Sequence, residues 1–135
     1  MTTPVISGDG IFSHVFIGAA DVEKSSAFYD VVLGTLGINN LGPFGNGWVL
    51  YGREKPAFII ARPGNGEAPS ANGVTVGFAA ATPEEVDAFH AAGLAAGGAD
   101  EADEGQPGPR GHLPGAYAAY LRDPAGNKIT AYTFI

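Results

Sequence analysis

The sequence predicts an α+β protein made of two βαβββ modules, whose strands form a curved mixed sheet shaped like a cup with the helices on its outside. Two observations predict this fold. The stretch from His14 to Gly37 aligns without gaps with Thr75 to Gly98, at an offset of 61 residues. In both copies a short apolar run leads into an amphipathic segment that ends at glycine, and further short runs follow between turn residues.

The first module is expected over about residues 11–63. Residues 12–18 form a short apolar run that is compatible with a buried strand. Asp21 can cap the helix that follows, because its carboxylate accepts early backbone N–H groups, and the glycines at 34 and 37 can end that helix. Three further strands are expected at residues 38–41, 47–51 and 56–62.

The second module is expected over about residues 73–135, so that all 135 residues form a single domain. A strand at 74–80 precedes Thr82-Pro83-Glu84-Glu85, in which threonine is the N-cap and Glu85 closes a capping box. The helix is expected to reach Gly97-Gly98. Residues 99–104 are weak as a strand and 105–114 read as a loop. The last two strands are expected at 117–122 and 128–134.

Composition excludes several classes of function. Seven Lys and Arg against fourteen Asp and Glu give a net charge of -7, which argues against nucleic acid and anionic membranes as partners and favours cationic ligands modestly. The absence of cysteine excludes disulfides and thiolate catalysis. The first ten residues show no secretory signal and no apolar run approaches 18 residues, so a cytoplasmic location without a membrane span is expected.

Three segments, in this order, carry a resemblance to a known superfamily. They read FSHVFIGAADVEKSSAFYD, VGFAAATPEEVDAFHAAGLAAGG and GQPGPRGHLPGAYAAYLRDPAGNKITAY, the last with a DP-x-GN turn. Together with the duplication they resemble the vicinal oxygen chelate superfamily, which includes glyoxalase I, bleomycin resistance proteins and extradiol dioxygenases. Short glyoxalase-like bacterial proteins are the most similar branch. The resemblance implies a homodimer with a small-molecule ligand in the cup.

Metal-using relatives hold a divalent ion in the cup with four ligands, typically His or Gln and then Glu in each module. Of the corresponding positions only His14 matches. The strand around Phe58 to Ile60 has no ligand atom, and Thr75 and Thr130 stand where His and Glu are usual. One imidazole and two hydroxyls make a poor divalent site. The sequence therefore predicts no cofactor and no standard metal site, and Zn, Ni, Fe or Mn held by His14 with unusual partners stays open.

Polar and aromatic side chains are expected to line the cup. His14 is interpreted as a ligand-binding group or general base, or alternatively as a satisfied histidine at a strand start. Arg110 and His112 lie in a loop that is near the mouth of the cup in relatives, and are either anchors for an anion or incidental loop residues. The complete set of ligand-binding candidates is His14, Trp48, Phe58, Thr75, Arg110, His112, Tyr117 and Thr130.

The sequence thus predicts a protein of the glyoxalase, bleomycin resistance and dioxygenase type that binds a small hydrophobic or aromatic molecule without a standard metal site. The alternative is an enzyme of the same superfamily, a divalent-metal-dependent lyase, isomerase or dioxygenase, whose catalytic residues are unknown. A third possibility is a structural or regulatory dimer whose cup is filled by its own side chains.

Overall fold

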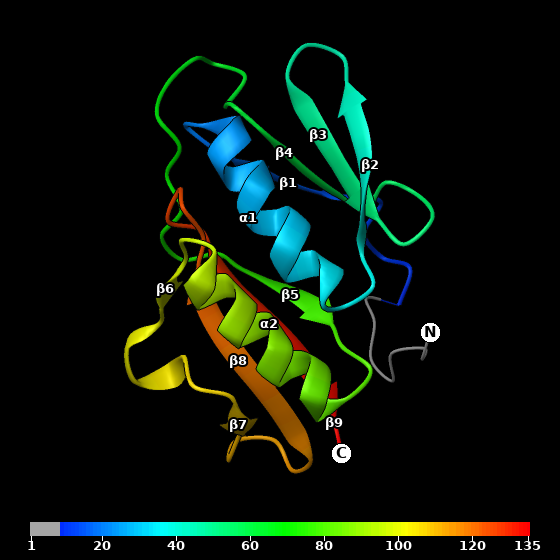
Figure 1. The fold of residues 1–135 in the computed structure, drawn as a ribbon, viewed down its shortest axis with the longest axis vertical. Helices are drawn as coiled ribbons and strands as arrows, with labels where there is room; N and C mark the ends of the chain where they lie inside the picture. Colours follow the sequence, from blue (N-terminus) through cyan, green and yellow to red (C-terminus); the bar gives the residue numbers. More distant parts are fainter. Residues whose placement is uncertain (1–8) are drawn as a thin grey trace.

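The structure is a computed structural model that describes residues 9–135, apart from the side chain of Asp103. No secretory signal was predicted in the first ten residues. Of these, residues 1–8 lie outside the described range. The first module forms a four-stranded sheet in the order β1-β4-β3-β2, with β1 parallel to β4 (Figure 1). Its strands are β1 (Val15–Gly18), β2 (Asn39–Phe44), β3 (Trp48–Gly52) and β4 (Phe58–Ala61).

The second module forms a five-stranded sheet in the order β5-β9-β8-β6, with β7 also paired to β8. A short 3-10 helix (Ala102–Glu104) follows β6. The two-module α+β fold is therefore confirmed, with its strands divided between two sheets. The strands are β5 (Thr75–Ala79), β6 (Ala99–Asp100), β7 (Gly108–Pro109), β8 (Ala116–Arg122) and β9 (Lys128–Phe134).

The two helices, α1 (Val22–Gly34) and α2 (Pro83–Ala95), begin where their capping residues predict. The Asp21 carboxylate accepts a hydrogen bond from the Lys24 N–H at 3.1 Å, and the Thr82 hydroxyl accepts one from the Glu85 N–H at 3.2 Å. The Glu85 carboxylate accepts from the N–H of Ala81 at 2.9 Å, one residue before the expected partner. Each helix thus has its first turn satisfied by side chains.

Both helices lie on the same side of the two sheets, and Figure 1 shows them side by side in front of the strands. Residues that face the helices, such as Ile60 and Ile129, are buried in one core that continues from the first module into the second. On the opposite face of the first sheet, Phe16 and Trp48 remain 40% and 37% exposed. The helix side of each sheet is therefore the core, and the other side is left partly uncovered.

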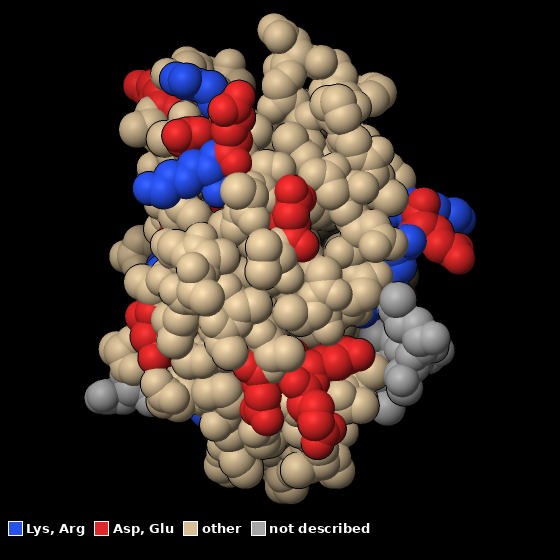
Figure 2. Space-filling model, viewed as in Figure 1, with Lys and Arg blue, Asp and Glu red and all other residues tan. Residues whose placement is uncertain are grey.

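Acidic groups are spread over the helix-bearing face of the molecule, as Figure 2 shows and as a net charge of -7 requires. Within residues 9–135 neither helix has the length and apolar character needed to cross a membrane.

A buried cluster of polar side chains joins the two modules. The Tyr29 hydroxyl, on α1, donates a hydrogen bond to Oδ2 of Asp123 at 2.6 Å. The Asn127 side-chain amide donates to the same oxygen and to the Gly18 carbonyl at the end of β1, both at 2.9 Å. Burial raises the pKa of the Tyr29 phenol well above its usual value, so the hydroxyl stays protonated and keeps donating. The DP-x-GN turn is therefore one point at which the second module is attached to the first.

Replacement of Tyr29 by phenylalanine should lower the free energy of unfolding by about 1–3 kcal/mol, because it leaves a buried carboxylate oxygen with one donor fewer. The measurement is urea denaturation followed by circular dichroism. Tyr117→Phe is the matched control, since the Tyr117 hydroxyl donates to Asp87 at an exposed position, and it should change stability by less than about 0.5 kcal/mol. Equal losses in the two variants would contradict the attachment role.

Candidate functional site

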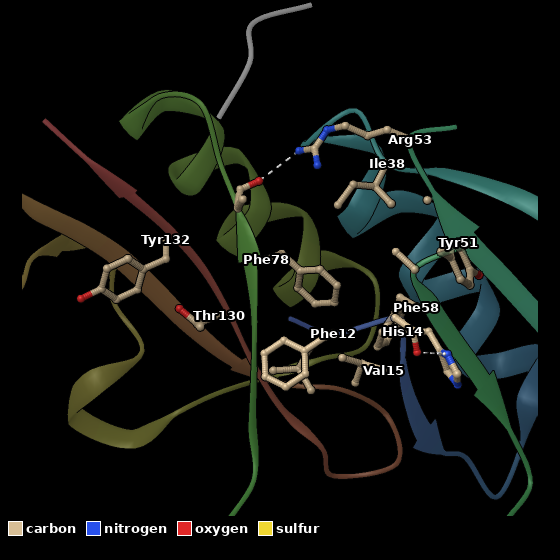
Figure 3. A pocket seen from close by; sticks show the side chains of 16 residues that line it. Phe12, His14, Val15, Ile38, Tyr51, Arg53, Phe58, Phe78, Thr130 and Tyr132 are labelled. Carbon is tan, nitrogen blue, oxygen red and sulfur yellow. Dashed lines mark hydrogen bonds between the residues drawn. The ribbon is translucent and has the colours of Figure 1, made fainter. Parts of the chain in front are cut away.

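A cavity of about 480 Å³ lies between the two modules, where β1 and β5 form the facing edges of their sheets (Figure 3). Most of its walls are apolar, and both modules contribute to them. The lining residues are Phe12, Ser13, His14, Val15, Ile38, Tyr51, Gly52, Arg53, Ala57, Phe58, Val76, Gly77, Phe78, Ala79, Thr130 and Tyr132.

The aromatic rings of Phe58 and Phe78 meet at the centre of this junction. Phe58 is the first residue of β4 and Phe78 lies on β5, with their ring centroids 5.0 Å apart and their planes at 85°. This edge-to-face arrangement is a favourable contact between aromatic rings. Since both side chains are almost fully buried, they hold fixed positions and form a rigid wall.

Tyr51 offers the cavity its ring but not its hydroxyl. The hydroxyl donates to the Asp30 carboxylate of α1 at 2.9 Å and also lies 2.9 Å from the Ser26 hydroxyl. Burial raises the pKa of the Tyr51 phenol, so the group is neutral at physiological pH. Tyr51 is thus a wall residue and is not placed to exchange protons with a ligand.

Arg53 supplies the cavity with a positive charge. It follows β3, and its Nη2 donates to the carbonyls of Leu36 and Ala79 at 3.0 and 3.1 Å, which bridges the two modules. Within the described residues Nη1 has no acceptor, and Nε is buried without a partner. Sequence reasoning missed Arg53, because in the stretch Arg53-Glu54-Lys55-Pro56 it reads as one more charged residue of an exposed turn.

His14 lies at the rim of the cavity, just before β1, and its side chain is exposed. Its Nδ1 is 2.9 Å from the hydroxyl of Ser13, which also lines the cavity. An exposed imidazole at the rim can reach a polar group on a ligand, and it is not a buried structural histidine.

The two threonines that replace the usual metal ligands differ in their surroundings. Thr130 is 5% exposed and lines the cavity, but its hydroxyl donates to the Ala119 carbonyl at 2.8 Å. Thr75 is exposed at the start of β5 and is not among the lining residues. The Thr130 hydroxyl therefore already donates a hydrogen bond within the sheet, and the Thr75 hydroxyl lies outside the cavity lining.

Trp48 and Tyr117 lie outside the cavity. The Trp48 ring contacts Phe16 and Phe44, with centroid distances of 5.3 and 5.9 Å, on the face of the first sheet that points away from α1. The Tyr117 hydroxyl donates to Asp87 of α2 at 2.7 Å. Trp48 thus belongs to an exposed aromatic cluster, and Tyr117 to the helix side of the second sheet.

Arg110 and His112 are also remote from the cavity lining. The Nη2 of Arg110 donates to the backbone carbonyls of Glu104, Gln106 and Ala118, and its guanidinium lies 5.2 Å from the centre of the Tyr120 ring. His112 is exposed in the same loop. Arg110 therefore holds its loop against the sheet. Of the eight candidate ligand-binding residues, the structure brings only His14, Phe58 and Thr130 together in the cavity lining.

Comparison with solved structures decides the family. The chain is similar to a glyoxalase/bleomycin resistance protein from Albidiferax ferrireducens T118, with 46% sequence identity, coverage of 93% of this chain and 100% of that chain, and a TM-score of 0.81. The chain belongs to the glyoxalase/bleomycin resistance protein family. This confirms the superfamily that the sequence motifs predicted.

Two more distant members share the fold with this family member. A glyoxalase/bleomycin resistance protein/dioxygenase family enzyme from Burkholderia phytofirmans PsJN is 20% identical over 91% of this chain and 98% of that chain, with a TM-score of 0.70. The fosfomycin resistance protein FosX from Mesorhizobium loti is 13% identical over 97% and 95%, with a TM-score of 0.64. No family model and no curated protein matches the chain.

The four positions that bind metal in metal-using relatives of the family do not supply a fitting donor set here. Phe58 to Ile60 have hydrocarbon side chains, the Thr130 hydroxyl is engaged with a carbonyl, and Thr75 is outside the cavity. His14 remains as a single nitrogen donor. Across residues 9–135 no three His, Cys, Asp or Glu side chains are grouped so that they can hold a metal ion.

The charge of the cavity is opposite to the charge of the whole chain. None of the sixteen lining residues is acidic, and Arg53 is a permanent cation. The preference for cationic ligands expected from the net charge of -7 therefore does not apply at the cavity, since contacts at the site outweigh charges elsewhere on the surface.

Thr130→Val and Thr75→Val compare the two threonine positions directly. Thr130→Val should lower the free energy of unfolding by about 1 kcal/mol, because it removes a buried hydrogen bond to Ala119 while keeping the side-chain shape. Thr75→Val alters an exposed strand residue and should stay within about 0.5 kcal/mol of the unsubstituted chain. Thermal and urea unfolding measure both. Equal stability of the two variants would show that the Thr130 hydroxyl has no structural role.

Proposed function

We propose that this family member binds a small, largely apolar molecule in the cavity between its modules. The observation that carries the proposal is the aromatic and aliphatic lining around about 480 Å³, which includes Phe58, Phe78, Ile38 and Val76. Pockets of about 300–1,000 Å³ with hydrophobic walls and a few polar groups are typical of small-molecule sites. His14 and Arg53 are the polar groups here, and of the other sequence-based candidates Phe58 and Thr130 remain in the proposed site.

The proposed binding does not use a divalent metal. The donor set described above supports this, because a stable divalent site generally needs three or more His, Cys or carboxylate ligands. The alternative, a metal-dependent lyase, isomerase or dioxygenase, is supported by the family relationship and would need donors other than those at the four expected positions. A plugged, purely structural cup receives no support from a cavity that opens beside His14. Homodimer formation and a cytoplasmic location stay predictions.

Apolar probes should stabilise the protein by mass action, by about 2.7 kcal/mol when the probe is at 100 times its dissociation constant. We expect the Tm to rise with the concentration of indole or 2-naphthol, measured by differential scanning fluorimetry. Trp48 lies outside the cavity, so its emission is not the reporter of choice.

Gly77→Leu tests whether the cavity is the site of that stabilisation. Gly77 and Thr130 both line the cavity, and a Cβ at Gly77 would lie 3.4 Å from Cγ2 of Thr130, so a leucine side chain adds bulk at this part of the cavity wall. The Tm shift should be lost in Gly77→Leu and kept in Val74→Leu, which adds the same side chain at an exposed position outside the cavity. Equal shifts in the two variants would refute the proposed site.

The metal content of the purified protein tests the proposal that binding does not use a divalent metal. Protein purified and then incubated with Zn, Ni, Fe or Mn salts should retain well under one ion per chain after desalting, as measured by elemental analysis. His14→Ala should not change that content. A stoichiometric ion that disappears in His14→Ala would support the metal-dependent alternative instead.

A further inference from the structure

The guanidinium of Arg53 is only partly used by the protein. Its Nη2 donates to two carbonyls, Leu36 in the first module and Ala79 in the second, and these bonds fix the position of the group. Figure 3 shows the bond to Ala79. Within the described residues Nη1 has no protein acceptor, and Nε is buried and unpaired. A buried donor without a partner destabilises a protein unless something else accepts its hydrogen bond. The arrangement therefore leaves Nη1 available as a donor on a side chain that is already held in place.

Among the residues that the structure describes, no carboxylate forms an ion pair with this group. The ion pairs formed by the described residues involve His90, Arg122 and Lys128, and Arg53 is in none of them. No Asp or Glu lines the cavity. A fixed, unneutralised cation beside an apolar space attracts an anion more strongly than the same cation in water.

The rest of the cavity is suited to an apolar body. Figure 3 places Arg53 at one end, Phe12 and His14 at the other, and Phe58 and Phe78 between them. A ligand that places one polar end at Arg53 would thus lay its remaining atoms against aromatic rings.

We propose that the cavity selects molecules that carry a carboxylate on an aromatic or branched apolar body, with the carboxylate bound by Arg53. This assignment rests on the function proposed above and names the ligand class for the same cavity. Since Nη2 already donates to two carbonyls, Nη1 is the donor that remains for a carboxylate, and the delocalised charge makes this a charge-assisted hydrogen bond. The single permanent cation in the lining balances a monoanion, so the cavity favours a carboxylate over a doubly charged phosphate group.

Three probes of nearly equal shape separate the roles of charge and apolar contact. Phenylacetate, phenylacetamide and phenethylamine share the same ring and differ in the charge of the attached group. Isothermal titration calorimetry on the full chain at neutral pH should show phenylacetate binding at least about tenfold more tightly than the amide, and the amine binding most weakly. Equal binding of acid and amide overturns the carboxylate assignment and leaves the apolar site standing. Absence of binding by all three overturns both proposals.

Arg53→Gln and Arg53→Lys locate the anion. In Arg53→Gln the preference for phenylacetate over the amide should disappear while the affinity for the amide stays the same, which also shows that the cavity is intact. If loss of the bridge to Leu36 and Ala79 prevents this variant from folding, Arg53→Lys decides. Its ammonium keeps the charge and can still donate to the two carbonyls, but it has no counterpart of the free Nη1, so the preference should fall several-fold. A preference that survives in the folded variant, with the carboxylate held elsewhere, overturns the role of Arg53.

Discussion

The carboxylate of Asp123 is 5% exposed, and a charge this well buried is tolerated only when its oxygens are paired. Oδ1 accepts hydrogen bonds from the backbone of Ala125 and Asn127 within its own turn. Oδ2 accepts from the Asn127 side chain and from Tyr29, which belongs to the other module. Full pairing therefore requires both modules to be in their native orientation. Because the cavity lies between the modules, the pairing of this buried carboxylate helps to fix the shape of the cavity.

Much of the fold could be predicted because its signals are local. The N-caps at Asp21 and Thr82 placed both helix starts correctly, since a side chain that accepts from the next turn acts within four residues. The long strands β8 and β9 were also predicted, because a tight turn separates two runs of strand-forming residues. Of the two-residue strands, β6 falls within residues 99–104, which were expected as a weak strand, and β7 falls within residues 105–114, which were read as a loop. They exist only through pairing with β8, and two residues carry no periodicity.

The site was less predictable, because the use of a polar side chain depends on which distant carbonyls lie nearby. Arg110 was singled out as an anchor for an anion, yet three carbonyls of its own loop and sheet accept its hydrogen bonds. Arg53 was passed over, yet it reaches Leu36 and Ala79, which lie 17 and 26 residues away. For both residues the sequence offered only the residue type and its neighbours in the chain, which do not show where the side chain donates. Both arginines donate from Nη2 to carbonyls and have a buried, unpaired Nε, and what separates them is that Arg53 lines the cavity while Arg110 does not.

The seam between β1 and β5 is closed by side chains alone, since the described strands of the two modules form separate sheets. Hydrogen bonds cross it at two ends, from Asn127 to Gly18 and from Arg53 to Ala79. Between these ties the gap is set by packing contacts, which are individually weak and adjust to volume. The middle of the seam therefore depends on how side chains fit against one another and not on strand pairing. Substitutions there can change the fit of the cavity in evolution while the two sheets stay as they are.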